Sequence, residues 1–187
     1  MNKAIALTAV TAFGLVGTAG AGIVTVDLGD VTLDPAGVAV FDIDMGFMHQ
    51  DQYVAEWTIS YHYGGNTDNI SWASDALFGV IGGNGNSASA GYYNSNSTLG
   101  LSWNLGNWSS AFNTSAASTF VSGTFDASVA NIGGGGFWTM IVADGFAGGS
   151  GPNTYGDVRF EFNIVPAPGA FALLGLAGVA AGRRRRR

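Results

Sequence analysis

Three carboxylates, Asp42, Asp44 and Glu56, form the group in this sequence whose types and spacing best suit chemistry. Asp42 and Asp44 lie two residues apart in a stretch that alternates apolar and polar side chains, so both point to one face of a predicted strand. If residues 38–45 and 53–62 form a hairpin, Asp42 lies opposite Glu56. Like charges placed in this way repel unless a cation bridges them, and carboxylate oxygens suit Ca²⁺. The pattern suggests a Ca²⁺ site at Asp42, Asp44 and Glu56, with a solvated acidic face as the alternative.

Hydrolysis is the other chemistry that these side chains suggest. Glycoside hydrolases use two carboxylates about 5–10 Å apart, and Asp42 with Glu56 would be the pair. His49 and His62 are the two histidines, and no nucleophile-elbow sequence accompanies them. There is no cysteine and no lysine after Lys3, which excludes cysteine nucleophiles and lysine Schiff-base chemistry from the body. We expect histidines on the surface and a protein that is not an enzyme.

Aromatic side chains suggest a different kind of site. Flat rings beside amide side chains suit the binding of sugars, and Tyr92, Tyr93 and Trp108 lie in or near stretches rich in Asn and Gly. We therefore take Tyr92, Tyr93 and Trp108 as candidate ligand-binding residues. The alternative is packing in the core, which alternation predicts for Trp57.

Charge is distributed unevenly along the chain. Residues 4–182 hold thirteen carboxylates and one cation, Arg159, for a formal charge of −12. Such a body repels nucleic acid and anionic lipid headgroups, so binding through phosphates is excluded. Cations, including Ca²⁺, are its expected charged partners.

Alternation with period two indicates the elements that position these residues. It covers residues 38–45, 53–62, 99–105 and 157–164, and further strands are expected at 23–28, 77–81, 118–125 and 137–142. Residues 137–142 are apolar on both faces, which indicates a central strand. Connections rich in Gly, Asn and Ser mark turns, and residues 84–98 are expected to form a long surface loop. The pattern predicts an all-β, antiparallel, jelly-roll-like β-sandwich over residues 22–164.

The N-terminus has the pattern of a secretory signal. A short positive start is followed by an apolar stretch and by a small-x-small cleavage site at Ala19 and Ala21. We expect residues 1–21 to direct export through the Sec machinery and to be removed by signal peptidase. A buried N-terminal helix is the alternative.

The C-terminus combines a proline motif, an apolar segment and a basic end. The motif is Val165, Pro166, Ala167, Pro168 and Gly169. The apolar run 169–182 would span about 21 Å as a helix, against roughly 30 Å for a bilayer core. The five basic residues are Arg183, Arg184, Arg185, Arg186 and Arg187. They are expected to stop transfer and keep the C-terminus in the cytoplasm.

This order of three parts resembles the PEP-CTERM sorting signal, in a Val-Pro-x-Pro variant where Ala167 replaces the glutamate of the family motif. The resemblance covers residues 165–187. It implies a C-terminal hydrophobic helix that anchors the chain in the membrane before processing by an exosortase-type protease. It also implies delivery to the cell surface or extracellular matrix, in association with exopolysaccharide and biofilm. A plain membrane anchor is the alternative.

Together these patterns predict a noncatalytic exported protein of the cell surface or matrix. The alternatives are a carbohydrate-binding or Ca²⁺-dependent adhesive module and a secreted glycoside hydrolase. No cofactor other than Ca²⁺ is suggested.

Overall fold

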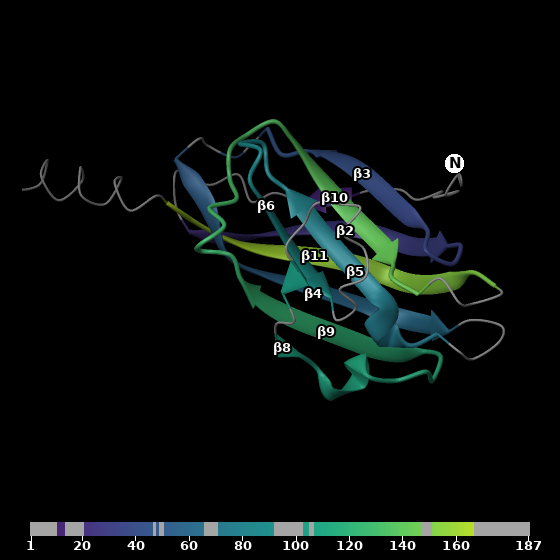
Figure 1. Cartoon of the computed structure of the whole chain (residues 1–187). Coiled ribbons are helices and arrows are strands. Elements are labelled where there is room, and N and C mark those ends of the chain that lie inside the picture. The colour runs from purple at the N-terminus through teal and green to yellow at the C-terminus, as the bar shows by residue number, and fades with distance from the viewer. Residues whose placement is uncertain are drawn as a thin grey trace, which may run out of the picture.

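The chain forms two β-sheets packed face to face in the computed structural model (Figure 1). The structure describes residues 11–13, 21–46, 48, 51–65, 71–91, 103–104, 107–146 and 151–166. The six-stranded sheet contains β1 (Thr11–Phe13), β2 (Gly22–Leu33), β4 (Gln52–Gly65), β8 (Asn107–Trp108), β9 (Thr119–Asp126) and β11 (Asn153–Pro166). The five-stranded sheet contains β3 (Val38–Asp44), β5 (Ala76–Ile81), β6 (Ser87–Gly91), β7 (Trp103–Asn104) and β10 (Phe137–Asp144). Two short 3-10 turns are η1 (Ala73–Asp75) and η3 (Ser110–Phe112).

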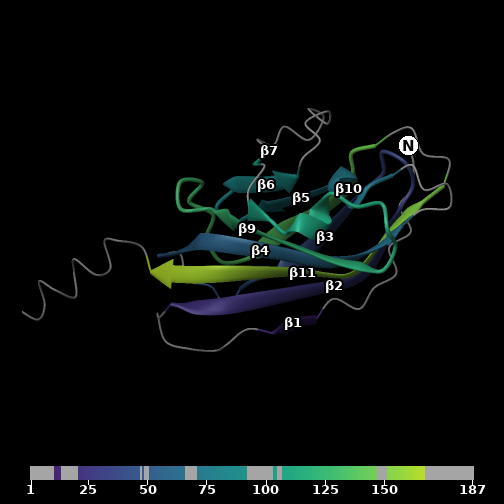
Figure 2. The same ribbon diagram turned by 90° about the horizontal axis from the view of Figure 1, so that it is seen from below.

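Eight of the strands follow the order of a jelly roll. Strands β2-β11-β4-β9 form one layer and β3-β10-β5-β6 the other, and all neighbours within these groups are antiparallel. Short strands β1, β8 and β7 extend the edges, and β7 pairs with β6 in parallel. Figure 2 shows the two layers, with β2, β11 and β4 in one and β5, β6 and β10 in the other. The predicted all-β sandwich is confirmed.

Large aromatic side chains from both sheets fill the space between them. Trp57 on β4 and Phe160 and Phe162 on β11 are at most 1% exposed, and Trp138 on β10 is fully buried. The rings of Trp138 and Phe162, from opposite sheets, have centroids 5.4 Å apart. The predicted core position of Trp57 is confirmed, and the alternation predicted for 157–164 puts Phe160 and Phe162 on one shared face, which points inward. Such rings bury roughly 150–250 Å² each and dominate core energetics.

The expected hairpin between residues 38–45 and 53–62 is wrong. β3 pairs with β10, and β4 pairs with β11 and β9. Met45 and Met48 are buried in the connection after β3, and the Met45 N–H donates to the Gly136 carbonyl at 2.7 Å. This anchoring beside the start of β10 carries the chain to the other sheet instead of turning it back.

The expected loop at 84–98 contains strand β6, whose Ala90 is fully buried. Small residues that alternate weakly gave no strand signal there, although they fit closely beside β5. The prediction that 137–142 is a central strand is confirmed, because β10 lies between β3 and β5. Of the strand expected at 99–105, only Trp103 and Asn104 are described, and they form β7.

The two ends of the body leave the sandwich at the same place. Gly22 at the start of β2 pairs with Ile164, and Pro166 at the end of β11 pairs with Gln52. We call this the near end, and the opposite end, where β10 stops and β11 begins, the far end. β11 continues to Pro166, so Val165 and Pro166 of the predicted sorting motif are part of the sheet. Strand β1, within the predicted signal peptide, pairs with β2.

Other parts of the predicted tail lie outside the described residues. They include Ala167, Pro168, Gly169, the expected C-terminal helix and all five arginines from Arg183 to Arg187. Within the described part of the chain, no helix is long and apolar enough to cross a membrane.

Truncating a core ring should destabilise the fold far more than truncating a surface ring. Phe160 is fully buried, whereas Phe137 is 69% exposed. We expect Phe160→Ala to lower the free energy of unfolding by about 3–5 kcal/mol through lost burial and a cavity. The matched change Phe137→Ala should cost less than about 1 kcal/mol. Urea unfolding followed by tryptophan fluorescence measures both, and similar losses would contradict the described packing.

Candidate binding face and buried polar cluster

The structure separates the three carboxylates that sequence reasoning grouped. Asp42 and Asp44 point outward from the five-stranded sheet, whereas Glu56 points outward from the six-stranded sheet. Asp42 accepts a hydrogen bond from the Thr139 hydroxyl at 2.7 Å, and Asp44 accepts one from the Gly46 N–H at 2.8 Å. A Ca²⁺ site at Asp42, Asp44 and Glu56 is therefore wrong, and so is a hydrolytic pair of Asp42 with Glu56. Both expectations depended on a hairpin between residues 38–45 and 53–62, which the structure does not form.

Trp108 is half-buried rather than a free aromatic platform. Its ring stacks on Phe112 with centroids 4.0 Å apart and packs edge-on against Phe125 and Tyr61. Its indole nitrogen is buried and has no hydrogen-bond partner among the described residues. Trp108 thus closes the side of the core beside β8. The other two candidates, Tyr92 and Tyr93, lie outside the described residues, as does His49.

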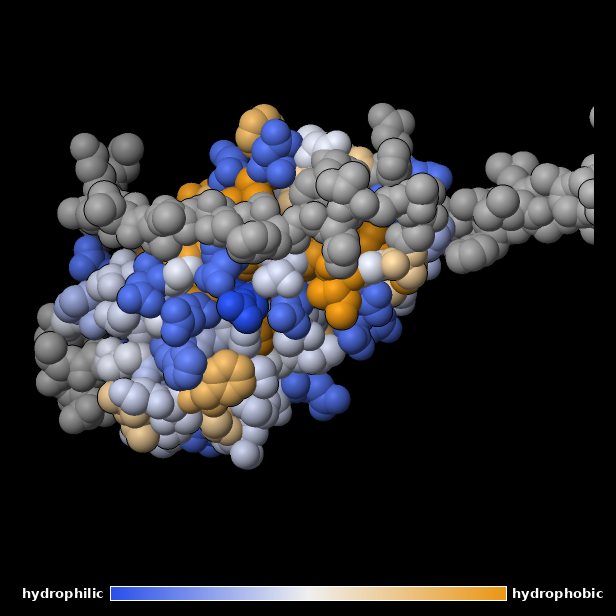
Figure 3. Space-filling view, turned by 180° about the vertical axis from the view of Figure 1, so that it is seen from behind, coloured by the Kyte–Doolittle hydropathy of each residue, from blue (hydrophilic) through white to orange (hydrophobic). Residues whose placement is uncertain are grey.

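A shallow hollow of about 130 Å³ lies on the outer face of the six-stranded sheet. Three neighbouring strands, β2, β4 and β11, supply its lining. The lining residues are Ile23, Glu56, Thr58, Glu161 and Asn163. Figure 3 views the molecule from this side and shows hydrophilic side chains over much of the face. We refer to this depression and its five lining residues as the hollow.

The polar groups of the hollow are mostly unengaged. Within the part of the chain that the structure describes, Glu56, Glu161 and Asn163 make no side-chain hydrogen bond or ion pair, while Thr58 contacts the Thr124 hydroxyl at 3.0 Å. On the adjoining strand, Asp126 pairs in register with Glu56. The hydroxyl and the backbone N–H of Ser128 hold the pKa of Asp126 below its usual value, so this side of the hollow stays anionic.

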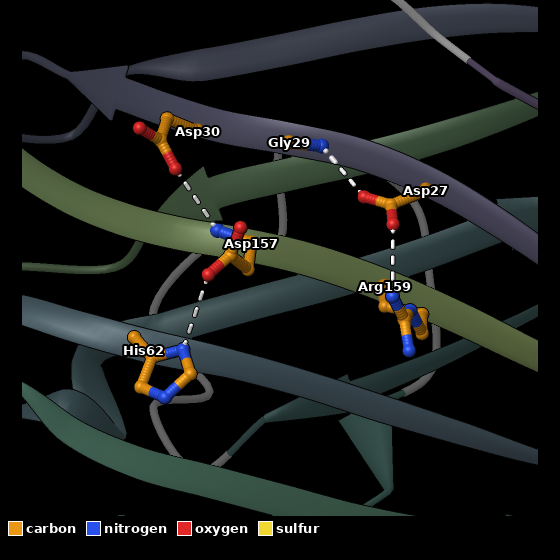
Figure 4. A network of polar contacts seen from close by, with 6 residues as sticks. All are labelled: Asp27, Gly29, Asp30, His62, Asp157 and Arg159. Carbon is orange, nitrogen blue, oxygen red and sulfur yellow. Dashed lines mark hydrogen bonds and ion pairs between the residues drawn. The ribbon is translucent and has the colours of Figure 1, made fainter.

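Further along the same face, the charged groups are paired with one another (Figure 4). Arg159 contacts Asp27 at 3.0 Å, rather than the two acids beside it on its own strand. Asp157 lies 3.5 Å from the imidazole of His62, and its backbone N–H donates to Asp30 at 3.0 Å. The surface position expected for His62 is confirmed. The carboxylates open to a ligand are therefore those of the hollow, not those of this network.

Sequence reasoning found only Glu56 of the hollow. Alternation did place Glu161 and Asn163 on the face opposite Phe160 and Phe162, which is where they lie. What it lacked was the pairing of β11 with β4, which brings Asn163 opposite Glu56.

A second group of polar side chains is buried at the far end of the sandwich. Asp144, at the end of β10, and Asn153, at the start of β11, are fully buried, and the Asn153 amide donates to Asp144 at 2.6 Å. Asp75 in η1 is 5% exposed and accepts from the Trp72 N–H at 2.7 Å. The Tyr155 hydroxyl is buried and, among the described residues, has no partner. We call Asp75, Asp144, Asn153 and Tyr155 the buried cluster.

The two carboxyl groups of the buried cluster oppose each other electrostatically. Burial raises the pKa of Asp144 to about 6, although hydrogen bonds from Phe146 and Asn153 lower it, and the charge of Asp75 raises it further. Burial likewise raises the pKa of Asp75. The pKa of Tyr155 is raised well above its ordinary value by burial and then by the charge of Asp144. The cluster therefore disfavours holding two negative charges without compensation.

Comparisons with known proteins gave matches in solved structures alone. No protein-family model and no curated protein matches the chain. A β-1,2-glucanase from Parabacteroides distasonis superposes with a TM-score of 0.40 at 10% identity, over 77% of this chain and 19% of the glucanase. SGBP-B from a complex xyloglucan utilization locus in Bacteroides uniformis gives 0.34 at 8% identity, over 76% of this chain and 40% of that chain. A cyanophage Pam1 capsid chain gives 0.33 at 15% identity, over 89% of this chain and 98% of that chain.

Asp144 should make stability depend on pH when no metal ion is present. Between about pH 4 and pH 6 the folded protein keeps a proton that the unfolded chain has released. The stability that this proton contributes is complete below pH 4 and is lost as pH rises through about 6. The loss amounts to about 3 kcal/mol.

Urea unfolding in a chelating buffer at pH 4.5 and pH 8 measures this effect. We expect Asp144→Asn to be more stable than the wild type at pH 8. Its free energy of unfolding should differ less between pH 4.5 and pH 8 than that of the wild type. Asp42→Asn, which removes an exposed carboxylate, serves as the control and should keep the wild-type slope. If the stability of Asp144→Asn depended on pH as strongly as that of the wild type, a group other than Asp144 would be responsible for the pH dependence.

Proposed function

We propose that this chain is a noncatalytic exported protein of the cell surface or extracellular matrix, which associates with neutral exopolysaccharide through the hollow. The observation that carries the proposal is the hollow itself. Carboxylate and amide groups from β4 and β11 stand unengaged on a rigid sheet, open to solvent and next to the apolar side chain of Ile23.

Hydroxyl-rich ligands suit these groups. The Glu56 and Glu161 carboxylates accept hydrogen bonds, and the Asn163 amide both donates and accepts them, which matches sugar hydroxyls that do both. The same face continues along β4 to His62, about 20 Å away at roughly 3.3 Å per residue. There, Phe120 is 53% exposed, and its ring centroid lies 5.2 Å from that of His62. An extended glycan would reach both the hollow and this ring.

Charge favours a neutral glycan over an acidic one. The outer face carries Asp27, Asp157 and the carboxylates of the hollow against the single cation Arg159. A polyuronate would meet like charge at each of these positions, whereas a neutral polysaccharide would not.

The export and sorting of the chain remain part of the proposal. The start of β2 and the end of β11 share the near end, so the signal peptide and the PEP-CTERM-like tail would both join the body there. While the tail is anchored in the membrane, the near end would face the lipid and the outer faces of both sheets would stay accessible. Signal peptidase, the Sec machinery and an exosortase-type protease are the proposed processing partners.

Removing the charge of the hollow should weaken glycan binding without unfolding the body. We expect the double variant Glu56→Gln with Glu161→Gln to bind a neutral glucan at least about tenfold more weakly in affinity electrophoresis, since hydrogen bonds to charged groups contribute roughly 1.5–3 kcal/mol each. The control, Asp42→Asn with Asp44→Asn, removes two exposed carboxylates from the opposite face and should bind like the wild type. Wild-type binding to a polyuronate should be weaker than to the glucan.

Two results would contradict this part of the proposal. Equal loss in both double variants would show that the hollow is not the binding site. Release of reducing sugar from the glucan by the wild type, abolished in Glu56→Gln, would make the protein a hydrolase.

The processing of the chain can be tested separately. Expressed in a bacterium that carries an exosortase-type protease, the chain should be recovered at the surface with Gly22 as its first residue. A version that ends at Pro166 should instead be released into the medium, because it lacks the anchor. Recovery of the unprocessed chain from the cytosol would contradict export.

A further inference from the structure

We propose that the buried cluster binds a calcium ion, held by the carboxylates of Asp75 and Asp144 and the side-chain carbonyl of Asn153, with the Tyr155 hydroxyl beside them. This inference is independent of glycan binding at the hollow, which lies on the outer face of the six-stranded sheet.

The fold brings these side chains together from both sheets. Asp144 ends β10 and pairs in register with Ala76, which directly follows Asp75. Asn153 begins β11 in the other sheet, and its amide reaches Asp144 at 2.6 Å across the interior. The Gly145 N–H donates to the Asp75 carbonyl at 2.7 Å and ties η1 to the end of β10. The site is therefore a meeting point of three elements at the far end.

Two oxygen atoms in the cluster lack partners. The side-chain carbonyl of Asn153 and the hydroxyl of Tyr155 are both buried, and neither finds a hydrogen bond anywhere in the described residues. An unsatisfied buried polar group destabilises a fold, and an ion or a water is a common reason for one. Since the Asn153 amide nitrogen contacts Asp144, its unpaired oxygen lies at the cluster.

Among the described residues, no cationic side chain pairs with either of the two carboxylates. Arg159 is the single cationic side chain between residues 4 and 182, and it contacts Asp27 on the outer face. His62 contacts Asp157, also on the outer face. A proton shared between Asp75 and Asp144 would remove one charge and satisfy one oxygen. A divalent cation would compensate both charges and coordinate the unpaired oxygens as well.

The donor set selects the ion. Every candidate ligand is a hard oxygen from a carboxylate, an amide or a phenol, which suits Ca²⁺ or Mg²⁺ rather than Zn²⁺ or Cu²⁺. Mg²⁺ keeps several waters and demands a regular octahedron, whereas Ca²⁺ accepts irregular sets of protein oxygens. A buried site whose protein oxygens come from three separate elements therefore favours Ca²⁺, which would clamp the two sheets together at the far end.

Calcium titration of the full chain, purified with a chelator and then dialysed, tests the site. We expect one Ca²⁺ per chain by isothermal titration calorimetry. We also expect the melting temperature to rise by roughly 5–10 °C when free Ca²⁺ is a hundredfold above Kd. Tb³⁺ should displace Ca²⁺ and luminesce when tyrosine is excited, because Tyr155 adjoins the site.

Variants locate the ion. Asp144→Asn and Asp75→Asn should each weaken Ca²⁺ binding at least about a hundredfold while far-UV circular dichroism stays that of the wild type. Asp42→Asn, an exposed acid of the same sheet, should leave binding unchanged. If either cluster variant fails to fold, the wild-type titration and the other variant still decide the question.

Three outcomes would overturn the proposal. The first is wild-type protein that shows neither saturable Ca²⁺ binding nor a calcium-dependent melting shift, which would mean that protons alone neutralise the pair. The second is undiminished binding in Asp144→Asn and Asp75→Asn. The third is equal weakening in Asp42→Asn.

Discussion

The burial of aromatic rows between the two sheets is the constraint on which the remaining features depend. Trp57 on β4 and Phe160 and Phe162 on β11 are buried between the sheets, where Phe162 packs against Trp138 on β10. A strand alternates with period two, so fixing the inward rows also fixes the outward ones, and a slip of one residue would exchange them. Glu56, Glu161 and Asn163 therefore face outward because their neighbours face inward. The hollow is a consequence of core packing.

The buried cluster depends on one irregularity in that pattern. Val158, Phe160 and Phe162 are inward at even positions, yet Asn153 and Tyr155 are inward at odd positions. The register shifts between Tyr155 and Val158 change the phase of β11, and Asp157 there has a φ of +50°. This left-handed conformation is unfavourable for a residue with a side chain. The hydrogen bond from the Asp157 N–H to Asp30, together with the contact to His62, holds it on the outer surface.

Local alternation explains why some features were predictable from the sequence and others were not. The inward rows of β4 and β11 follow from each strand alone and agree with the predicted alternation, whereas β10 was predicted only as a central strand that is apolar on both faces. The pairing partner of a strand depends on where the connection after it leads. Met45 and Met48 are buried in the connection that takes the chain to the other sheet. Nothing in their sequence pattern distinguishes such a crossing from a hairpin. Asp144 did carry a signal, since it continues the inward series Trp138, Met140, Val142. Asn153 and Tyr155 carried none, because the irregularity in β11 reverses their direction.

Because the body has almost no cationic side chains, its exposed and its buried carboxylates differ in how their charge can be compensated. On the outer face, Glu56 and Glu161 are hydrated, so their charge needs no partner and they remain available to hydroxyl groups. Inside, Asp75 and Asp144 have lost that hydration, and a chain with ordinary lysine content would compensate them with an ammonium or guanidinium group. Here Arg159 is committed to Asp27 at the surface. Under the calcium proposal the compensating charge comes from solution. The oxygens of Asn153 and Tyr155, which have no partner among the described residues, favour a metal ion over a proton because one proton can satisfy only one oxygen.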